Sequence, residues 1–476
     1  MSYQEFLNQK SHLSGDFGFS PLWMPDKLFD FQKFLVEWAC QKGRSAIFAD
    51  CGLGKTFMQL AWAENVVKKT NKRVLILTPL AVAKQTCGEA EKLGVEVTRS
   101  RDGKFSSSQK IIITNYERLH YFNPHDFDGA CCDESSIIKH WSGATQKKVT
   151  RFMAKKPYRL LCTATAAPND WPELGTSSEA LGELSFSDMR KRFFRQLDDK
   201  GQKKAFREQK DAEKKVSYYG KLSFRVSQSI GQWRLKNHAV NDFWKWVSSW
   251  ARACQMPSDL GFSDEGFQLP PLIENDHIIH PDSPPDGFLF TLPAVGLQEE
   301  REERKRTLNQ RVEFAANLVD HQDQAVVWCH YNSEGDALER AIPDAVQVAG
   351  KTPDEEKEEI YDAFLSGEQR VLITKPKIGA WGLNWQHCAH TVTFATHSYE
   401  QYYQSLRRFW RFGQKNPVRL DVIASEGEQR VLENMRRKSA QAQVMFAKML
   451  KFMNQSQKIT QKSKHQEEIE VPAWIQ

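Results

Sequence analysis

Residues 26–180 alternate short apolar runs with longer segments of helical periodicity. The apolar runs typical of buried strands are residues 45–49, 74–77, 111–114, 129–132 and 159–163. The segment 56–69 between two of them has the periodicity of a helix. Because strands that alternate with helices form a parallel sheet covered on both faces, the pattern predicts an α/β lobe.

The same alternation resumes at about residue 276. The strands expected there are residues 325–329, 345–348, 370–374, 391–394 and 418–423, with helices at 299–319 and 352–365. Residues 181–275 break the rhythm, because they are charged, then rich in tryptophan, and end in Leu269-Pro270-Pro271. The sequence therefore predicts an α/β fold with two parallel-sheet lobes in tandem and a helical insertion between them.

These patterns divide the chain into five parts. The expected parts are an N-terminal extension (1–25), a first α/β lobe (26–180), a basic, mostly helical insertion (181–275), a second α/β lobe (276–452) and a polar tail (453–476). A chain of 476 residues is long enough for more than one compact core, which agrees with this division.

Composition excludes several classes of protein. The chain is 40% hydrophobic and 26% charged, which argues against wholesale disorder, and no apolar run approaches the ~18–20 residues of a membrane helix. The nine cysteines form no CxxC pair, so neither a disulfide framework nor a structural zinc site is expected. His387, Cys388 and His390 form a local group of metal-ligand types, but no second cluster could complete a site. We expect a cytoplasmic protein without a resident transition metal.

The basic charge is concentrated in the insertion. Residues 188–236 carry 15 lysines and arginines against 6 aspartates and glutamates, a net +9 in a chain whose total is +6. This favours a polyanionic partner, although a solvated helical face explains the charge equally well. Aromatic side chains there could stack on unpaired bases or, more often for such residues, pack a helical core: Phe193, Phe194, Tyr218, Tyr219 and Trp233.

A glycine-rich loop follows the first expected strand and opens the first expected helix. It reads Ala49, Asp50, Cys51, Gly52, Leu53, Gly54, Lys55, Thr56. Glycines let backbone N–H groups close around phosphate oxygens, and the helix N-terminus adds partial positive charge. Lys55 then reaches the β- and γ-phosphates and Thr56 holds Mg²⁺. The loop predicts an ATP·Mg²⁺ site, even though Ala49 stands where the general pattern has glycine.

An acidic pair follows a later strand of the same lobe. Asp133 and Glu134 come directly after residues 129–132, at the strand end where open α/β sheets bind ligands. One carboxylate is needed there to hold Mg²⁺ and a second to position and deprotonate water. We assign the first role to Asp133 and the second to Glu134.

With the segments around them, these motifs resemble a superfamily 2 helicase-type ATPase. The likeness covers most of residues 26–440 apart from the insertion, and it is greatest to the Swi/Snf-type branch and to helicases encoded by phages and prophages. Its first-lobe segments are Phe29-Asp-Phe-Gln32, Leu77-Thr-Pro-Leu80, Thr114-Asn-Tyr-Glu117, Asp133-Glu-Ser-Ser-Ile-Ile-Lys139 and Thr163-Ala-Thr-Ala-Ala-Pro-Asn169. The resemblance implies two RecA-like lobes. It also implies that Gln32 contacts adenine, and that the nucleic-acid backbone meets Thr78, Pro79, Asn115, Thr163 and Thr165.

The second half carries the remaining family segments. They are Lys377-Ile-Gly-Ala-Trp-Gly-Leu-Asn384 and Gln404-Ser-Leu-Arg-Arg-Phe-Trp-Arg-Phe-Gly-Gln414. The resemblance places Gly382 at the nucleotide, Asn384 at nucleic acid, and Gln404, Arg408 and Arg411 at the γ-phosphate. The spacing of Arg408 and Arg411 predicts that they share one face of a helix. Ser135 and Ser136 depart from the family by replacing the Ala-His of the DEAH pattern.

The resulting hypothesis is an ATP-dependent DNA translocase or helicase, with duplex or branched DNA as the expected track. It would act as a monomer in the cytosol of a bacterium or phage-infected host, in phage replication or recombination. Two alternatives stay open at this point. One is an RNA-dependent ATPase, and the other is a nucleotide-gated DNA clamp or loader that does not move. The second would be expected to have a degraded acidic pair or to lack the arginines, and neither holds here.

Overall fold

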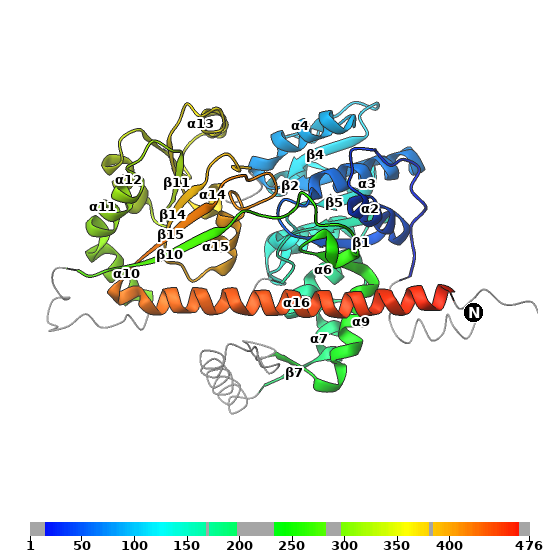
Figure 1. Ribbon diagram of the computed structural model, residues 1–476. Coiled ribbons are helices and arrows are strands. Elements are labelled where there is room, and N and C mark those ends of the chain that lie inside the picture. Colours follow the sequence, from blue (N-terminus) through cyan, green and yellow to red (C-terminus); the bar gives the residue numbers. More distant parts are fainter. Residues whose placement is uncertain (1–14, 168–170, 198–232, 282–296, 380–383, 466–476) are drawn as a thin grey trace, which may run out of the picture. The chain divides into compact units, whose positions relative to one another are not determined.

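The computed structural model describes residues 15–167, 171–197, 233–281, 297–379 and 384–465. The chain divides into two compact units, shown with their element labels in Figure 1. Unit 1 comprises Met1–Thr78, Thr86–Asp264 and Gln441–Gln476, and unit 2 comprises Pro79–Gln85 and Glu265–Ala440. Each unit is built on its own parallel sheet, as the sequence pattern predicts.

Unit 1 contains a seven-stranded sheet in the order β3-β4-β2-β5-β6-β1-β9. All its neighbouring strands are parallel. The strands are β1 (Arg44–Ala49), β2 (Arg73–Thr78), β3 (Thr98–Arg99), β4 (Ile111–Asn115), β5 (Phe127–Cys132), β6 (Tyr158–Cys162) and β9 (Ala251–Cys254). In this order β6 lies between β1, which leads into the glycine-rich loop, and β5, which leads into Asp133 and Glu134.

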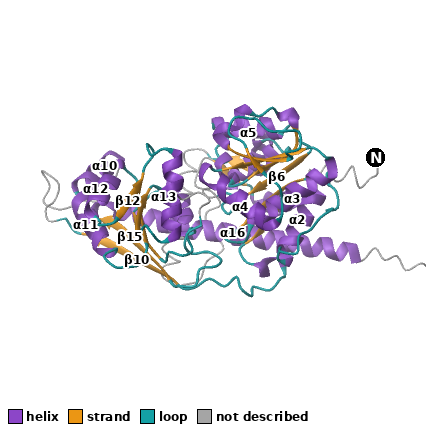
Figure 2. Cartoon of the chain, turned by 90° about the horizontal axis from the view of Figure 1, so that it is seen from above, coloured by secondary structure: helices purple, strands orange, loops and turns teal. Residues whose placement is uncertain are grey.

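Helices flank the faces of this sheet (Figure 2). The helices before residue 200 are α2 (Asp30–Lys42), α3 (Lys55–Thr70), α4 (Ala83–Leu93), α5 (Ala144–Met153), α6 (Leu174–Leu181) and α7 (Phe186–Phe193). Alternate strand residues such as Phe48, Leu77 and Leu161 face one large apolar core. Because the strands are buried on both faces, their sequences are almost continuously apolar, which is why the pattern predicts them correctly.

The segment between the two predicted lobes differs in part from the expectation. It contains α7, the antiparallel pair β7 (Phe194–Gln196) and β8 (Trp233–Leu235), and α9 (Val240–Trp250). However, β9 follows α9 directly and pairs parallel with β1. Phe193 and Phe194 are buried in the core of unit 1, as their core interpretation predicts, whereas Tyr218 and Tyr219 lie outside the described residues. This segment therefore completes the first sheet.

Unit 2 contains a six-stranded parallel sheet in the order β10-β15-β14-β11-β13-β12. Its strands are β10 (Leu272–Ile279), β11 (Ala325–Trp328), β12 (Ala345–Val348), β13 (Val371–Thr374), β14 (His390–Phe394) and β15 (Val418–Ser425). Its helices are α10 (Leu297–Arg306), α11 (Leu308–Leu318), α12 (Asn332–Ala341), α13 (Asp354–Ser366), α14 (Pro376–Gly379) and α15 (Tyr399–Leu406). The single helix expected over 299–319 is thus two helices that meet at Thr307.

The last helix, α16 (Gln429–His465), is longer than predicted. The sequence predicts a polar tail from residue 453, but the helix continues to His465. Its apolar residues Met449, Leu450 and Met453 join the core of unit 1, where Phe452 stacks on Trp244 with ring centroids 5.8 Å apart. This packing stabilises the helix as far as Met453, the first residue of the predicted tail.

Among the described residues, no helix combines the length and the apolar character needed to cross a membrane.

Candidate functional site

The glycine-rich loop joins β1 to the first residue of α3. Gly52 and Gly54 have φ values of 88° and 75°, a region that residues with a Cβ atom seldom adopt. Lys55 is buried, and its Nζ donates hydrogen bonds to the carbonyl oxygens of Ala49 at 2.9 Å and Asp50 at 3.1 Å. Thr56 lies half-buried in the first turn of α3. The loop thus presents an ammonium group, a hydroxyl and a helix N-terminus together, the donor set that a nucleotide phosphate requires.

Gln32 of α2 supports this loop through a side-chain hydrogen bond. Its Nε2 donates to the carbonyl oxygen of Leu53 at 2.9 Å, and its Oε1 accepts from the N–H of Phe29 at 3.0 Å. A Cβ atom on Gly54 would lie 2.3 Å from Gln32 Nε2, so this glycine permits the close approach. The contact with adenine that the resemblance implies for Gln32 stays a prediction, while its contact with the loop is direct.

Asp133 follows β5 and is tied to the same helix as the loop. Gln59, one turn beyond Lys55, donates from Nε2 to Asp133 Oδ1 at 2.7 Å. Burial and the neighbouring charge of Glu134 raise the pKa of Asp133 to about 6, although Gln59 and Lys55 both oppose this shift. Two buried carboxyl groups side by side favour a cation between protein and phosphate, so the donor set fits Mg²⁺ held by Thr56 and Asp133.

Glu134 has an unusual backbone conformation. Its φ of 50° and ψ of 52° are left-handed, which is rare for a residue other than glycine and is found often at functional sites. Thr163, directly after β6, donates from Oγ1 to Glu134 Oε2 at 3.3 Å, and the N–H of Thr165 donates to the same hydroxyl at 3.1 Å. The acidic pair is therefore linked to the segment after β6 that the resemblance assigns to nucleic acid.

The remaining candidates from the first predicted lobe are buried. Thr78 is fully buried, and its hydroxyl donates to the carbonyl oxygen of Thr114 at 3.5 Å. Asn115 accepts from the N–H of Arg118 at 3.2 Å and so caps the short helix that follows β4. Pro79, directly after β2, is also buried. Their role at a nucleic-acid backbone stays a prediction, because these side chains already have partners or are shielded from solvent.

Two residues of the site were missed by the sequence reasoning. Gln59 lies four residues beyond Lys55, so the helical repeat alone places it on the face of the loop lysine and could have identified it. The hydroxyl of Tyr116 donates to the backbone carbonyl of Asp133, and no spacing in the sequence indicates that contact. Both fix the position of Asp133.

The arginine segment of unit 2 differs from the predicted helix. Helix α15 ends at Leu406, and residues 407–413 continue as turns, so Arg408 and Arg411 do not share a helix face. Arg408 is buried, and its guanidinium donates to Gln404 at both the backbone carbonyl (3.0 Å) and Oε1 (3.1 Å). Gln404 and Arg408 thus form a pair, while Arg411 is half-buried.

Aromatic packing explains why the helix ends there. Phe409 is buried against Trp328 and Trp385, with ring centroids 6.3 and 5.9 Å apart. Trp410 donates from Nε1 to the carbonyl oxygen of Pro270 at 2.8 Å, and Gly413 has a φ of 90°. These contacts hold both rings in place in the turn that ends at Gly413.

Asn384 is a further candidate whose surroundings are partly described. Its Oδ1 is buried and has no hydrogen-bond partner among the residues that the structure describes. Buried acceptors are normally paired, so this one is available to a ligand or a rearranged loop. Gly382, assigned to the nucleotide by the resemblance, lies outside the described residues.

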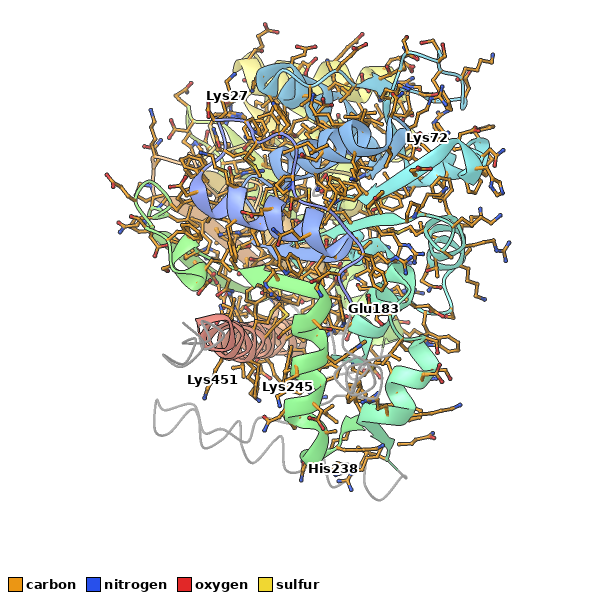
Figure 3. The ribbon with its side chains drawn as sticks, turned by 90° about the vertical axis from the view of Figure 1, so that its right-hand side faces the viewer. Lys27, Lys72, Glu183, His238, Lys245 and Lys451 are labelled. Atoms are coloured by element: carbon orange, nitrogen blue, oxygen red, sulfur yellow. The ribbon has the colours of Figure 1, made fainter. Side chains whose placement is uncertain are left out.

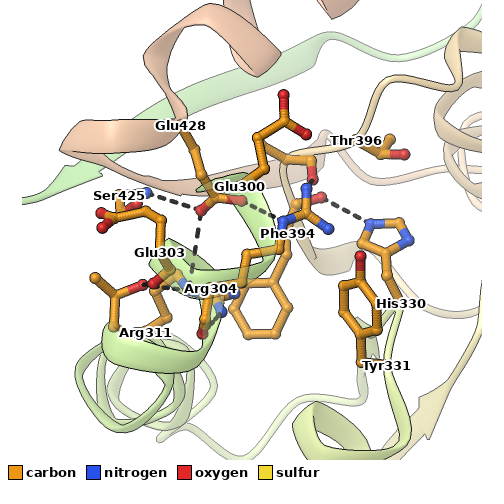
Figure 4. A network of polar contacts seen from close by, with 12 residues as sticks. Glu300, Glu303, Arg304, Arg311, His330, Tyr331, Phe394, Thr396, Ser425 and Glu428 are labelled. Atoms are coloured by element: carbon orange, nitrogen blue, oxygen red, sulfur yellow. Dashed lines mark hydrogen bonds and ion pairs between the residues drawn. The ribbon is translucent and has the colours of Figure 1, made fainter. Parts of the chain in front are cut away.

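A buried charge network lies where β14 and β15 end in unit 2 (Figure 4). Arg304 donates from Nε to Glu428 at 2.6 Å and from Nη2 to the carbonyl oxygen of Ala395 at 2.8 Å. Arg311 donates to Glu334 at 3.0 Å, and Glu334 in turn accepts from the backbone N–H groups after β11. This network holds together the ends of three neighbouring strands.

The histidines near Cys388 also have structural partners. His390 Nε2 lies 2.8 Å from Asp421 Oδ2, and its Nδ1 lies 2.7 Å from His321 Nε2. His277 Nε2 lies 2.8 Å from the other Asp421 oxygen. No group of three or more metal-ligand types with metal-binding geometry occurs in the part of the chain that the structure describes.

Comparison with known protein families gives a match over part of unit 2. Residues 307–413 match the helicase conserved C-terminal domain. The Sulfolobus solfataricus SWI2/SNF2 ATPase core in complex with dsDNA is 15% identical, with a TM-score of 0.40, and the similarity covers 91% of this chain and 96% of that chain. No curated protein matches the sequence.

The matched region begins at Thr307 and ends at Gly413, so it includes strands β11–β14 and the segment of Gln404, Arg408 and Arg411. Unit 1 supplies the glycine-rich loop and the acidic pair at strand ends of one parallel sheet. Residues 307–413 of unit 2 thus carry a helicase conserved C-terminal domain.

Proposed function

We propose that this protein is an ATP-dependent translocase or helicase that moves on DNA, with duplex or branched DNA as its track. The observation that carries the ATPase part is the Gln59–Asp133 hydrogen bond. It links Asp133, the carboxylate proposed to hold Mg²⁺, to the helix that begins with Lys55 and Thr56. A chance Gly-Lys-Thr sequence or a solvated Asp-Glu pair would have no reason to meet in this way.

The loop lysine has a defined task in this proposal. In the structure its ammonium group is bound by two carbonyl oxygens of the loop itself, from Ala49 and Asp50. We infer that it exchanges these partners for β- and γ-phosphate oxygens when ATP binds. Mg²⁺ held by Thr56 and Asp133 would neutralise charge on the same phosphates.

Glu134 is the proposed general base. Its carboxylate would accept a proton from the water that attacks the γ-phosphate. The hydrogen bond from Thr163 holds one of its oxygens, which leaves the other to orient the water. Because Thr163 begins the segment assigned to nucleic acid, a shift of that segment would move the base. This contact offers a physical route by which nucleic acid could stimulate hydrolysis.

Arg408 and Arg411 are proposed to stabilise negative charge as the γ-phosphate leaves. Arginine fingers of this kind raise hydrolysis rates by ~10³–10⁵-fold. Gln404 holds the guanidinium of Arg408 through two hydrogen bonds, which reduces the number of orientations it can adopt. Gln404 is therefore a positioning residue in this proposal.

Steady-state ATP hydrolysis measured in parallel with duplex DNA, single-stranded DNA and RNA tests the proposal. We expect the strongest stimulation by duplex DNA, whereas stimulation by RNA alone would replace it with an RNA-dependent ATPase. Displacement of a triplex-forming strand then tests movement, because a clamp or loader would hydrolyse ATP without displacing it.

Two substitutions test the assigned chemistry. Lys55→Ala should abolish hydrolysis, while Lys72→Ala, which removes an exposed lysine of the same unit (Figure 3), should not change it. Glu134→Gln should retain ATP binding and lower turnover by ~10²–10⁴-fold, the contribution of a general base. Near-normal turnover of Lys55→Ala would show that the loop is not a phosphate site. Loss of ATP binding by Glu134→Gln would deny Glu134 the role of base.

A further inference from the structure

Trp141 is an exposed tryptophan close in sequence to the acidic pair. It lies seven residues beyond Glu134, after the short helix Ser135–Ile138, and 54% of its surface is exposed. One face of its indole ring stacks on Phe186 of α7, with centroids 5.6 Å apart and an angle of 11° between the planes. The ring is thus held in place on one side and remains accessible.

Arg190 lies against the same rings. Its guanidinium carbon is 4.6 Å from the ring centroid of Phe186, 4.6 Å from that of Trp233 and 5.6 Å from that of Trp141. Among the described residues this side chain forms no hydrogen bond or ion pair, and its Nε is buried without an acceptor. Aromatic faces orient a guanidinium but do not neutralise it, so the charge of Arg190 is available to bind an anion.

The surrounding elements are basic. Helix α7, strands β7 and β8 and the residues next to them carry these cationic side chains: Arg190, Lys191, Arg192, Arg195, Arg234 and Lys236. Within α7 and these two strands the one carboxylate is Asp188, which accepts a hydrogen bond from Ser185 at the start of α7. The patch therefore attracts anions, and its exposed ring offers a flat apolar face beside the Arg190 guanidinium.

We propose that Trp141, Arg190 and Trp233 form a binding site for an unpaired nucleotide, with the base stacked on Trp141 and the adjacent phosphate bound by Arg190. A flat ring beside a guanidinium that can bind an anion matches the alternation of base and phosphate along a single strand. Paired bases cannot stack in this way because their faces are covered by neighbouring pairs. The site goes beyond the proposed movement on duplex DNA and requires no ATP.

This site gives the chain a contact for junctions, in which paired and unpaired segments adjoin. The rings belong to the loop after the acidic pair and to the segment after α6, both within unit 1. The resemblance assigns none of these three residues to nucleic acid. In the part that the structure describes, the proposal gives the basic stretch at 188–236 a specific binding function. The alternative interpretation was a solvated helical face.

Fluorescence anisotropy without nucleotide tests the proposal, with a labelled 12-nucleotide oligothymidylate and a labelled blunt duplex of equal length as probes. Trp141→Ala should raise the Kd for the single strand about tenfold or more, as loss of one base–aromatic stack does. The Kd for the duplex should change less than twofold, and Trp141→Phe should restore most of the single-strand affinity. Arg190→Gln should weaken single-strand binding and reduce the slope of log Kd against log salt by about 0.7.

Tyr121→Ala is the matched control, because Tyr121 is 53% exposed in the same unit but lies outside this patch. It should leave both Kd values unchanged. Equal losses for single strand and duplex in Trp141→Ala, or no loss for the single strand, would overturn the site. An acidic peptide that displaces the oligonucleotide equally well from the wild-type protein and from Trp141→Ala would also overturn the site. That result would indicate a protein-binding patch. Because no ATP is present, failure of the translocase proposal would leave these results unaffected.

Discussion

The buried network at the strand ends of unit 2 makes a sharp prediction for Glu428→Gln. The network contains two guanidinium groups, Arg304 and Arg311, and two carboxylates, Glu334 and Glu428, so its charges balance. Glu428 is fully buried, and its oxygens lie 2.6 Å from Arg304 Nε and 4.0 Å from Arg311 Nε. Glutamine has the same shape but no charge, so the substitution leaves one buried positive charge without compensation.

The size of the effect follows from the cost of such a charge. Removing one partner of a buried ion pair destabilises a protein by ~3–5 kcal/mol, a large part of a typical total of ~5–15 kcal/mol. At about 1.4 kcal/mol for each factor of ten, the population of the unfolded unit should rise by about two to three and a half orders of magnitude. Glu426→Gln is the control, because Glu426 lies in the same short helix and its ion-pair partner, His280, is largely exposed. Its effect should stay below about 0.5 kcal/mol.

Hydrogen exchange measured by mass spectrometry is the suitable assay, because a chain with two units need not unfold in one transition. Protection of peptides covering β14 and β15 should fall by about 10²-fold or more, while that of peptides covering β2 and β4 of unit 1 should not change. Arg304→Met combined with Glu428→Leu should recover most of the loss, since apolar replacement of a buried pair is often neutral. A loss below tenfold in Glu428→Gln, or additive losses in the double variant, would refute the reasoning.

Three further predictions concern individual side chains. Gln59→Leu removes the donor to Asp133, so the Mg²⁺ concentration needed for half-maximal ATP hydrolysis should rise ~10–100-fold; an unchanged requirement would contradict a positioning role. Gly427→Ala would place a Cβ atom 2.7 Å from Glu303 Cδ, so urea unfolding should show unit 2 destabilised by ~1–3 kcal/mol, unlike Gly350→Ala, where space is open. Burial lowers the pKa of His330 and His387 below the ordinary value of 6.5 in the folded protein. As pH falls, these histidines therefore bind protons in the unfolded chain before they do so in the folded protein, which favours unfolding. Protection of β11 should therefore decrease from pH 7.5 to 5.5, and a constant or rising value would contradict this.

The sequence predicted most of the strands because of where they lie in the sheets. Central parallel strands are buried on both faces, so they appear as continuous apolar runs, as in β2 and β4. The missed strands lack that signal. β10 carries Glu274, Asn275 and Asp276 and lies at the edge of its sheet, where charged side chains are common. β9 is short and follows the tryptophan-rich α9 directly, so the sequence pattern does not distinguish it from the preceding helix.

The candidate residues of the site were identified for a different reason. Lys55 and Asp133 were selected because binding of phosphate and Mg²⁺ requires these residue types at strand ends, and that requirement is visible in the sequence. Gln59 and Tyr116 fix the position of Asp133, yet any residue that donates a hydrogen bond from the right place could do so. The helical repeat places Gln59 on the face of Lys55, but the contact of Tyr116 depends on the fold, and residue spacing does not identify it.

The arginine segment shows where spacing misleads. A separation of three residues predicts a shared helix face only if the helix continues, and α15 ends at Leu406. Phe409 packs in the core beside Trp328 and Trp385. Burial of a phenylalanine contributes ~1.5–3 kcal/mol, which exceeds the free energy of intrinsic helix propensity that is lost when one helical turn does not form. Gln404 nevertheless reaches Arg408 through the last turn. The motif therefore specifies which groups are present, while aromatic packing specifies their orientation. We expect Phe409→Ala to lower the rate of ATP hydrolysis as much as Arg408→Ala does.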